Sequence, residues 1–120
     1  MPKILIVDDQ PEIRRLFSIT LGTSYNVLEA EDGSAALEII RQQHPAVVLL
    51  DIMMPGDLDG LQVLDAIRSD PLLIGTLVVI VSARGQSADV QIGQQRGADA
   101  YFVKPFSPIE VLTWIREKLK

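Results

Sequence analysis

Short runs of apolar residues recur along this chain, and each run is followed by a segment with helical spacing. The clearest runs cover residues 4–7, 47–50 and 77–81. Apolar runs of this length, bounded by turn signals, are typical of central strands in a parallel sheet whose two faces are both covered. The alternation of such strands with helices predicts an α/β fold.

The full pattern predicts five strand–helix units. The expected strands cover residues 3–7, 25–30, 46–50, 77–81 and 99–103, and the expected helices cover residues 11–21, 33–43, 61–69, 88–96 and 107–119. The second strand is the most polar, with Asn26 and Glu29, which places it at an edge. We therefore expect one domain over residues 1–120, a doubly wound five-stranded parallel sheet with helices on both faces and the flavodoxin-like order 2-1-3-4-5.

Polar residues stand directly after four of the predicted strands. Asp8 and Asp9 follow the first strand, Asp51 the third, Ser82 the fourth and Lys104 the fifth. Because the carboxyl ends of parallel strands share one edge, where open α/β sheets bind their ligands, we expect these side chains to converge. The three aspartates would lie at the switch point between the first and third strands.

Three carboxylates at one place repel one another and require a countercharge. Lys104 and a divalent cation are the candidates to supply it. Magnesium prefers an octahedral shell of one or two carboxylates, water and phosphate oxygens. We expect Asp9 and Asp51 to bind Mg²⁺ directly, Asp8 to bind it directly or through water, and the backbone carbonyl of Met53 to complete the protein's share.

A carboxylate held beside Mg²⁺ is equipped to attack phosphorus and form an acyl phosphate. This makes Asp51 the candidate acceptor, with the Ser82 hydroxyl and Lys104 each binding a phosphoryl oxygen. In-line phosphoryl transfer depends on positioning and charge neutralisation more than on a base. The single histidine, His44, precedes Pro45 at a predicted helix end away from this edge, so the donor must be another molecule.

These residues resemble the motifs of the receiver domain of bacterial two-component response regulators, of the chemotaxis-regulator type, over essentially the whole chain. The matching motifs are Asp8-Asp9, Asp51-x-x-Met54-Pro55, Ser82-Ala83 and Lys104-Pro105-Phe106, with Asp59-Gly60 and Gly97-Ala98-Asp99 at common family positions. The resemblance implies that a histidine kinase phosphorylates Asp51 while Asp8 and Asp9 hold Mg²⁺. It also implies that Ser82 and Tyr101 form the switch and that the Lys104–Pro105 peptide is cis.

Two positions depart from the family pattern. Three residues, 56–58, stand between Pro55 and Asp59 where the common pattern has two, which lengthens the loop after Asp51. Ala100 stands where many DNA-binding members have a second aspartate. For those members the family implies a charge-paired dimer through the fourth helix, fifth strand and fifth helix, and the missing aspartate weakens that expectation here.

The fourth predicted helix has a thin apolar face, made by Val90 and Ile92, and carries Gly93 in its interior. Low local stability is typical of an element that shifts between two states. We expect Ser82 to move toward a phosphoryl group on Asp51, and Tyr101 to enter the space that Ser82 leaves.

Composition narrows the partners and the compartment. The net charge of −5 argues against direct nucleic-acid binding through a basic face, and the absence of cysteine excludes disulfide and thiolate chemistry. No apolar stretch approaches the roughly 20 residues of a membrane helix. We expect a cytoplasmic protein without a signal peptide. The family resemblance implies as partners a sensor histidine kinase or phosphotransfer protein, and an output protein or domain reached through the fourth helix, fifth strand and fifth helix.

Three functions compete for this pattern. The first is a regulatory phospho-acceptor, with self-limited phosphoryl transfer and autodephosphorylation rather than enzymatic turnover. The second is a Mg²⁺-dependent phosphohydrolase with an aspartyl nucleophile, but such enzymes usually carry an acid where this chain has Met53. The third is a nucleotide- or flavin-binding module, which lacks the expected glycine-rich loop after the first strand.

Overall fold

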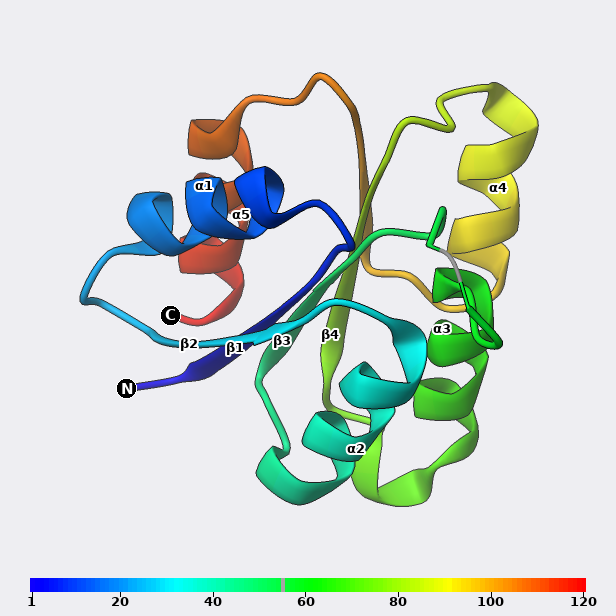
Figure 1. Cartoon of the computed structure of the whole chain (residues 1–120), viewed down its shortest axis with the longest axis horizontal. Helices are drawn as coiled ribbons and strands as arrows, with labels where there is room; N and C mark the ends of the chain where they lie inside the picture. The colour runs from blue at the N-terminus through cyan, green and yellow to red at the C-terminus, as the bar shows by residue number, and fades with distance from the viewer. Residues whose placement is uncertain (55) are drawn as a thin grey trace.

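The computed structural model describes residues 1–54 and 56–120, which form a five-stranded parallel sheet with five α-helices (Figure 1). The strand order is β2-β1-β3-β4-β5, and every neighbouring pair is parallel. The strands are β1 (Lys3–Val7), β2 (Asn26–Ala30), β3 (Val47–Leu50), β4 (Leu77–Ser82) and β5 (Ala100–Val103). The predicted fold class and strand order are confirmed.

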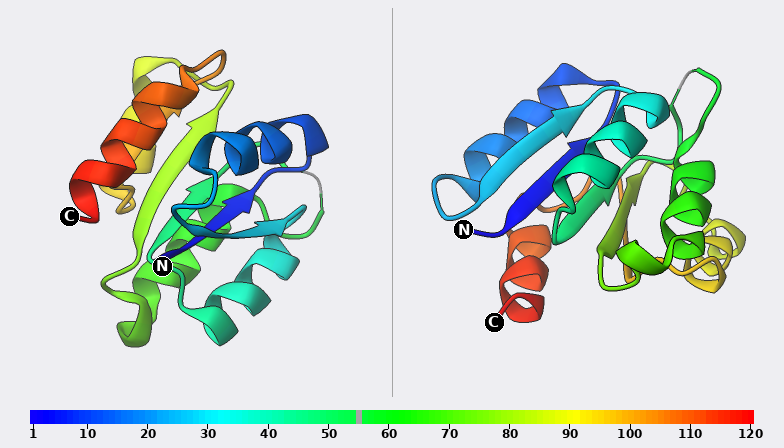
Figure 2. Two further views of the ribbon diagram at one scale, coloured as in Figure 1. Left: turned by 90° about the vertical axis from the view of Figure 1, so that its left-hand side faces the viewer. Right: turned by 90° about the horizontal axis from the view of Figure 1, so that it is seen from below.

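Helices cover both faces of the sheet (Figure 2). One face carries α1 (Pro11–Leu21) and α5 (Pro108–Lys118), and the other carries α2 (Gly33–Gln43), α3 (Gly60–Ser69) and α4 (Ser87–Gln95). All predicted elements are present within one residue of their expected bounds, and a short 3₁₀ helix, η1 (Pro71–Leu73), was not predicted. In the described part of the chain, no helix has the length and apolar character needed to cross a membrane.

Side chains at the N-cap positions fix where several helices begin. Asp32 and Ser107 each accept a backbone N–H bond in the first turn of α2 and α5. Asp59 and Gln62 form a reciprocal capping box at the start of α3. Such caps contribute about 1 kcal/mol each. The residue before α4, Gln86, makes no side-chain cap, so the start of α4 lacks this stabilisation.

The sheet separates two apolar cores, because each central strand is buried on both faces. Along β1, Leu5 belongs to the core under α2 and α3, whereas Ile6 belongs to the core under α1 and α5. In the second core, Phe17 of α1 stacks on Phe106 with ring centroids 5.0 Å apart. This stacking packs the segment that follows Lys104 against α1, close to the carboxyl edge of the sheet.

Helix α4 packs on the sheet through a glycine. Gly93 is its one buried residue, and a Cβ atom there would lie 2.8 Å from Ile80 Cδ1 and 3.1 Å from the ring of Tyr101. Ile92, predicted to belong to the apolar face, is instead 42% exposed. The prediction for Ile92 was wrong because the helix approaches β5 along the side of Gly93, where the absence of a side chain permits close contact.

Candidate functional site

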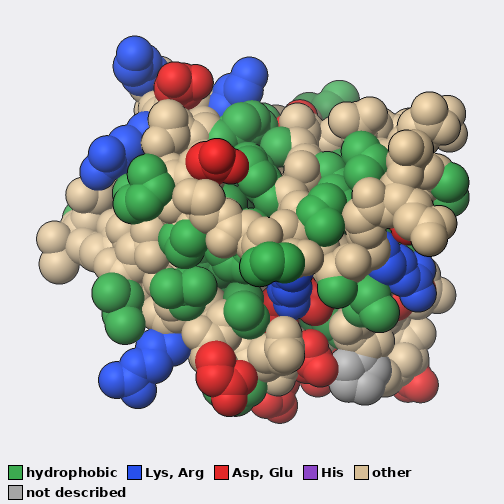
Figure 3. Space-filling view, turned by 90° about the horizontal axis from the view of Figure 1, so that it is seen from above, with side chains coloured by type: hydrophobic (Ala, Val, Ile, Leu, Met, Phe, Trp, Pro, Cys, Tyr) green, Lys and Arg blue, Asp and Glu red, His purple; other side chains and the backbone are tan. Residues whose placement is uncertain are grey.

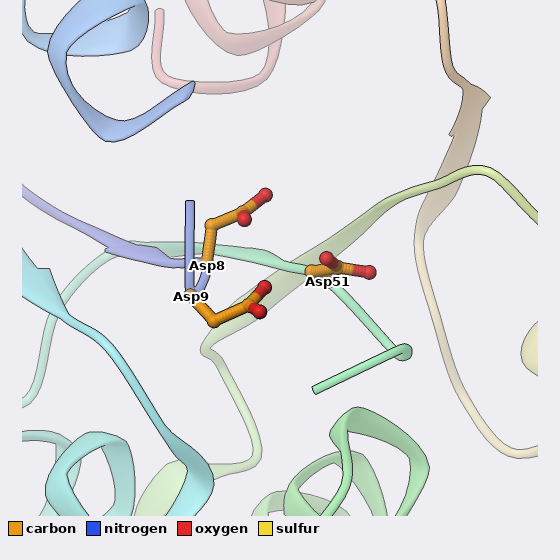
Figure 4. Close-up of side chains that lie close together, drawn as sticks. All are labelled: Asp8, Asp9 and Asp51. Atoms are coloured by element: carbon orange, nitrogen blue, oxygen red, sulfur yellow. The ribbon is translucent and has the colours of Figure 1, made fainter. Parts of the chain in front are cut away.

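Three carboxylates meet at the carboxyl ends of β1 and β3 (Figure 4). Asp8 and Asp9 follow β1 and Asp51 follows β3, and one oxygen from each lies within 4.8 Å of the others. Asp8 and Asp51 are 2% and 4% exposed, while Asp9 is exposed to solvent. Because β1 and β3 are neighbours in the sheet, the strand order itself brings these residues together. The cluster has the oxygen donors that a hard divalent cation requires.

Each buried carboxylate is fixed by the backbone of its own turn. Asp8 Oδ1 accepts a hydrogen bond from the Gln10 N–H at 2.9 Å, and Asp51 Oδ1 accepts one from the Met53 N–H at 2.9 Å. Arg14 Nη1 donates to the backbone carbonyl of Asp8 at 2.7 Å, which holds the turn after β1. The second oxygen of each carboxylate therefore faces the centre of the site with a defined orientation.

Lys104 lies between the two buried carboxylates. Its Nζ donates to Asp8 Oδ2 at 2.9 Å, to Asp51 Oδ2 at 3.2 Å and to Gln10 Oε1 at 3.2 Å. The Lys104–Pro105 peptide is cis, as the family resemblance implied. Gln10 was missed by the sequence reasoning. Its position directly after the aspartate pair was the only available signal, since nothing in the sequence marks a neutral amide as the third acceptor for Lys104.

Burial and neighbouring charges shift the pKa values of Asp51 and Lys104. Burial raises the pKa of Asp51 above its ordinary value, and the charge of Asp8 adds to this, although the Met53 N–H and Lys104 oppose it. Burial lowers the pKa of Lys104, but the hydrogen bond to Asp8 and the charges of Asp51 and Asp8 outweigh it, so the pKa of Lys104 is raised. The one ammonium group of Lys104 therefore bonds to two of the three clustered carboxylates, and a further positive charge would reduce the repulsion among them.

Ser82 and Tyr101 are connected through one residue of the loop before α4. Ser82 is fully buried, and its Oγ accepts a hydrogen bond from the Arg84 N–H at 3.2 Å. The Tyr101 hydroxyl donates to the backbone carbonyl of Arg84 at 2.5 Å. The backbone of Arg84 thus joins the hydroxyl expected to bind a phosphoryl oxygen to the aromatic residue expected to report the change.

The site opens to solvent through a small pocket of about 230 Å³. It is lined by Asp9, Gln10, Asp51, Met53, Ala83 and Lys104. A wider hollow of about 560 Å³ adjoins it and is lined by Asp9, Glu31, Asp32, Gly33, Ser34, Gly56, Asp57 and Leu58. The wider hollow contains only one of the three clustered carboxylates, and it lacks Lys104. The smaller pocket therefore brings Asp9, Asp51 and Lys104 together at the surface.

The lengthened loop after Asp51 packs against the start of α2. A Cβ atom on Gly33 would lie 2.5 Å from the backbone carbonyl oxygen of Leu58, so the two backbones touch. Gly56 has φ of 104°, a conformation that favours glycine. Pro55, part of the motif that followed Asp51 in the sequence, lies outside the described residues. The extra residue thus leaves Asp51 in place beside Asp8 and Lys104.

Comparison with known proteins places this geometry in a family. The model of the response regulator receiver domain matches residues 4–116. The DNA-binding response regulator MtrA of Mycolicibacterium smegmatis is 37% identical over 98% of this chain, which covers 50% of that protein. The chain spans about half the length of the curated relatives it matches.

Solved structures agree with the sequence comparison. The BeF3-activated DrrB receiver domain superposes with a TM-score of 0.91 at 29% identity, covering 99% of this chain and 97% of that one. The chemotaxis protein CheY4 of Vibrio cholerae superposes with a TM-score of 0.88 at 30% identity, covering 98% of each chain. The chain belongs to the response regulator receiver domain family.

Proposed function

We propose that this chain is a phosphorylation-dependent signalling switch in which Asp51 accepts a phosphoryl group in the presence of Mg²⁺. The observation that carries the proposal is the meeting of three carboxylates with Lys104 at one pocket of a receiver domain. We further propose that residues 1–120 act as a single receiver domain in the cytoplasm, either alone or joined to an output domain.

The transfer itself needs little beyond alignment and charge neutralisation. A bond forms between the phosphorus and one carboxylate oxygen of Asp51 as the bond from phosphorus to the donor breaks. The electron pair of that bond leaves with the donor, a histidine imidazole or the carboxylate of a small acyl phosphate. Lys104 exchanges an acceptor within the site for a phosphoryl oxygen, and the Ser82 hydroxyl donates a hydrogen bond to another phosphoryl oxygen.

Asp9 and Asp51 are proposed to bind Mg²⁺ directly, with Asp8 binding directly or through water. Two observations support this set: the oxygens of the three side chains lie within 4.8 Å of one another, and Asp9 is exposed at the pocket where an ion enters. The ion would supply charge neutralisation for the phosphoryl oxygens. The backbone carbonyl of Met53 as a further ligand stays a prediction.

We propose regulation rather than enzymatic turnover. Met53 lies two residues after Asp51 and lines the pocket, where an aspartyl-nucleophile phosphohydrolase would need an acid to protonate its leaving group. A thioether cannot donate a proton. Such a site takes up a phosphoryl group once and loses it slowly to water.

The proposed donor is a sensor histidine kinase or a phosphotransfer protein. An apolar hollow of about 440 Å³ lies beside the pocket and is lined by Ile13, Leu16, Lys104, Pro105, Phe106 and Pro108. Figure 3 shows hydrophobic side chains gathered beside the charged groups on this side of the molecule. A donor protein seated on this apolar surface would bring its phosphorylated imidazole to Asp51. The proposed output surface is formed by α4, β5 and α5.

The proposed function is tested by intact mass measurement after incubation with Mg²⁺ and a small acyl phosphate. The wild type should gain the mass of one phosphoryl group, and Asp51→Asn should gain none while keeping its circular dichroism spectrum. Asp57→Asn, which changes an exposed aspartate of the same loop, is the matched control and should label like the wild type. Equal labelling of Asp51→Asn would reject Asp51 as acceptor, and sustained hydrolysis of phosphate esters would favour the phosphohydrolase.

A further inference from the structure

The two ends of α4 are held very differently. At the carboxyl end, Arg96 forms a two-pronged ion pair with Asp65 of α3: Nε donates to Oδ1 at 3.0 Å, and Nη2 donates to Oδ2. Pairs of this kind fix both position and orientation, because the planar guanidinium matches the carboxylate through two parallel hydrogen bonds. The last turn of α4 is therefore tied to α3.

Arg68 of α3 makes a second attachment at the same end. Its Nε donates to the carbonyl of Gly97 at 2.9 Å, Nη1 to the carbonyl of Thr76 at 2.8 Å, and Nη2 to Asp99 Oδ2 at 2.8 Å. Asp99 Oδ2 also accepts the backbone N–H of Val78 at 2.8 Å. One side chain thus joins the turn after α4 to α3 and to the start of β4.

The turn between α4 and β5 is shaped to accept this arginine. Gly97 has φ of 104°, and a Cβ atom there would lie 2.9 Å from Arg68 Cγ and 3.0 Å from Nε. The Ala98 N–H bonds back to the carbonyl of Gly93 at 3.0 Å, which closes the helix end. We call Arg68, Arg96 and their partners Asp65 and Asp99 the arginine clamp.

The amino end of α4 makes no ion pair among the described residues, although its loop contacts β5 at Gly85, where a Cβ atom would lie 2.6 Å from Val103 Cγ1. Residues 83–88 are all exposed, and the N-cap residue Gln86 makes no side-chain hydrogen bond. Two hydrogen bonds hold the loop, from the Arg84 N–H to Ser82 Oγ and from the Tyr101 hydroxyl to the Arg84 carbonyl. Both partners are the proposed switch residues, so both bonds change if Ser82 turns toward a phosphoryl group.

We infer that α4 is hinged at its carboxyl end, and that its first turns swing about the arginine clamp when the loop at Arg84 rearranges. The trigger rests on the proposed function, whereas the hinge is a property of the unphosphorylated protein. Displacement should be largest over residues 84–90 and should vanish toward Asp99. The part of α4 that carries the signal is then its amino-terminal half.

Amide hydrogen exchange of the unphosphorylated full chain tests the hinge directly. The Val90 N–H bonds to the carbonyl of Gln86 at 3.1 Å near the free end, and the Arg96 N–H bonds to the carbonyl of Ile92 at 3.0 Å at the clamped end. After correction for intrinsic rates, Val90 should exchange at least about tenfold faster than Arg96, since local opening starts where attachments are few. Equal rates, or faster exchange at Arg96, would overturn the hinge.

Removing one arm of the clamp sharpens this test. Asp65→Ala should raise the exchange rates of the Arg96 and Ala98 amides about two- to fivefold, as expected for loss of a partly exposed ion pair, and leave Val90 unchanged. The matched control is Glu29→Ala, because Glu29 is also a 48% exposed carboxylate paired with an arginine, Arg14, far from α4. An equal effect of both variants on Arg96, or none from Asp65→Ala, would reject the clamp.

A phosphoryl mimic separates the hinge from its trigger. With Mg²⁺ and beryllium fluoride, amide chemical shifts should change over residues 84–90 and stay within error over residues 96–99. Changes of equal size at both ends would overturn the hinge. A protein that shows the exchange gradient along α4 but no shift at Ser82 would retain the hinge and contradict the proposed function instead.

Discussion

Two regions at the carboxyl edge of the sheet differ in how firmly their residues are held in place. The first, called the acceptor region for its proposed role, comprises Asp8, Asp9 and Asp51. It follows β1 and β3, in which every residue except Lys3 is buried, and both buried carboxylates are fixed by backbone N–H groups of their own turns. The reporter region, Ser82, Arg84, Tyr101 and α4, depends on an exposed loop and on a helix with one buried residue. Chemistry requires fixed geometry, whereas signalling requires an element of low local stability.

One side chain spans the two regions. Lys104 follows β5, beside the reporter region, yet its ammonium group donates to Asp8 and Asp51 of the acceptor region. A phosphoryl group on Asp51 would accept hydrogen bonds from both Lys104 and the buried Ser82 hydroxyl. The rigid acceptor region and the loosely held reporter region lie on neighbouring strands. The charge of one phosphoryl group would therefore act directly on both regions.

The largest effect should come from the metal side of the acceptor region. Asp9→Ala should weaken Mg²⁺ binding by at least about tenfold, because one of few oxygen ligands is lost, and labelling should recover at high Mg²⁺. Glu31→Ala removes an exposed carboxylate that lines the adjoining hollow and serves as the control. Titration followed by amide shifts measures both affinities. Wild-type affinity in Asp9→Ala would remove Asp9 from the ligand set.

A smaller effect should come from the residues two positions after Asp51 and two positions after Ser82, which are Met53 and Arg84. Met53 is 47% exposed at the pocket and Arg84 lies on the exposed loop, and neither can act as a base toward an in-line water. We therefore predict slow dephosphorylation, and a phosphoryl lifetime shortened on the order of tenfold in the double variant Met53→Asn and Arg84→Glu, whose polar groups can hold that water.

Phosphate release after removal of the donor measures this lifetime. Met53→Leu keeps the apolar bulk and should behave like the wild type, which separates water access from any change in packing. If the wild type loses phosphate as fast as the double variant, Met53 and Arg84 do not control access of water to Asp51.

The smallest effect concerns stability. Because burial raises the pKa of Asp51, holding its charge in the folded state costs stability at every pH above the ordinary value of 3.8. Asp51→Asn removes that cost, and a gain on the order of 1 kcal/mol at neutral pH would raise the melting temperature by about 4 °C.

The difference in stability between Asp51→Asn and the wild type should depend on pH. The advantage of Asp51→Asn should shrink as pH falls through the raised pKa of Asp51, and disappear below 3.8, where Asp51 is protonated in both folded and unfolded states. Denaturant unfolding at several pH values, without Mg²⁺, checks this. Lower stability of Asp51→Asn at neutral pH would show that the bond to Lys104 outweighs burial.

The sequence was sufficient for the acceptor region because strand ends carry a positional signal. Apolar runs located β1 and β3, and the parallel strand order then predicted that Asp8, Asp9 and Asp51 lie at one edge of the sheet. The starts of the helices were also predicted accurately, because cap residues such as Asp32 and Ser107 mark them locally in the sequence.

The reporter region could not be predicted to the same depth. The link through the Arg84 backbone and the contacts of Arg68 and Arg96 join elements distant in sequence, and no periodicity marks them. Gly93 was interpreted only as a weakness of α4, whereas it also permits close contact with Ile80 and Tyr101. Such contacts depend on how the helices and strands pack in space, which the sequence pattern does not show.

The most direct test of the account is whether Ser82 carries the signal from the acceptor region to the reporter region. Amide shifts of Arg84 and Tyr101 should be recorded with and without Mg²⁺ and beryllium fluoride, in the wild type and in Ser82→Ala. The variant keeps Asp51 and Lys104 and should still bind the mimic, but its shift changes at Arg84 and Tyr101 should be much smaller. Identical shift changes in the two proteins would contradict the account.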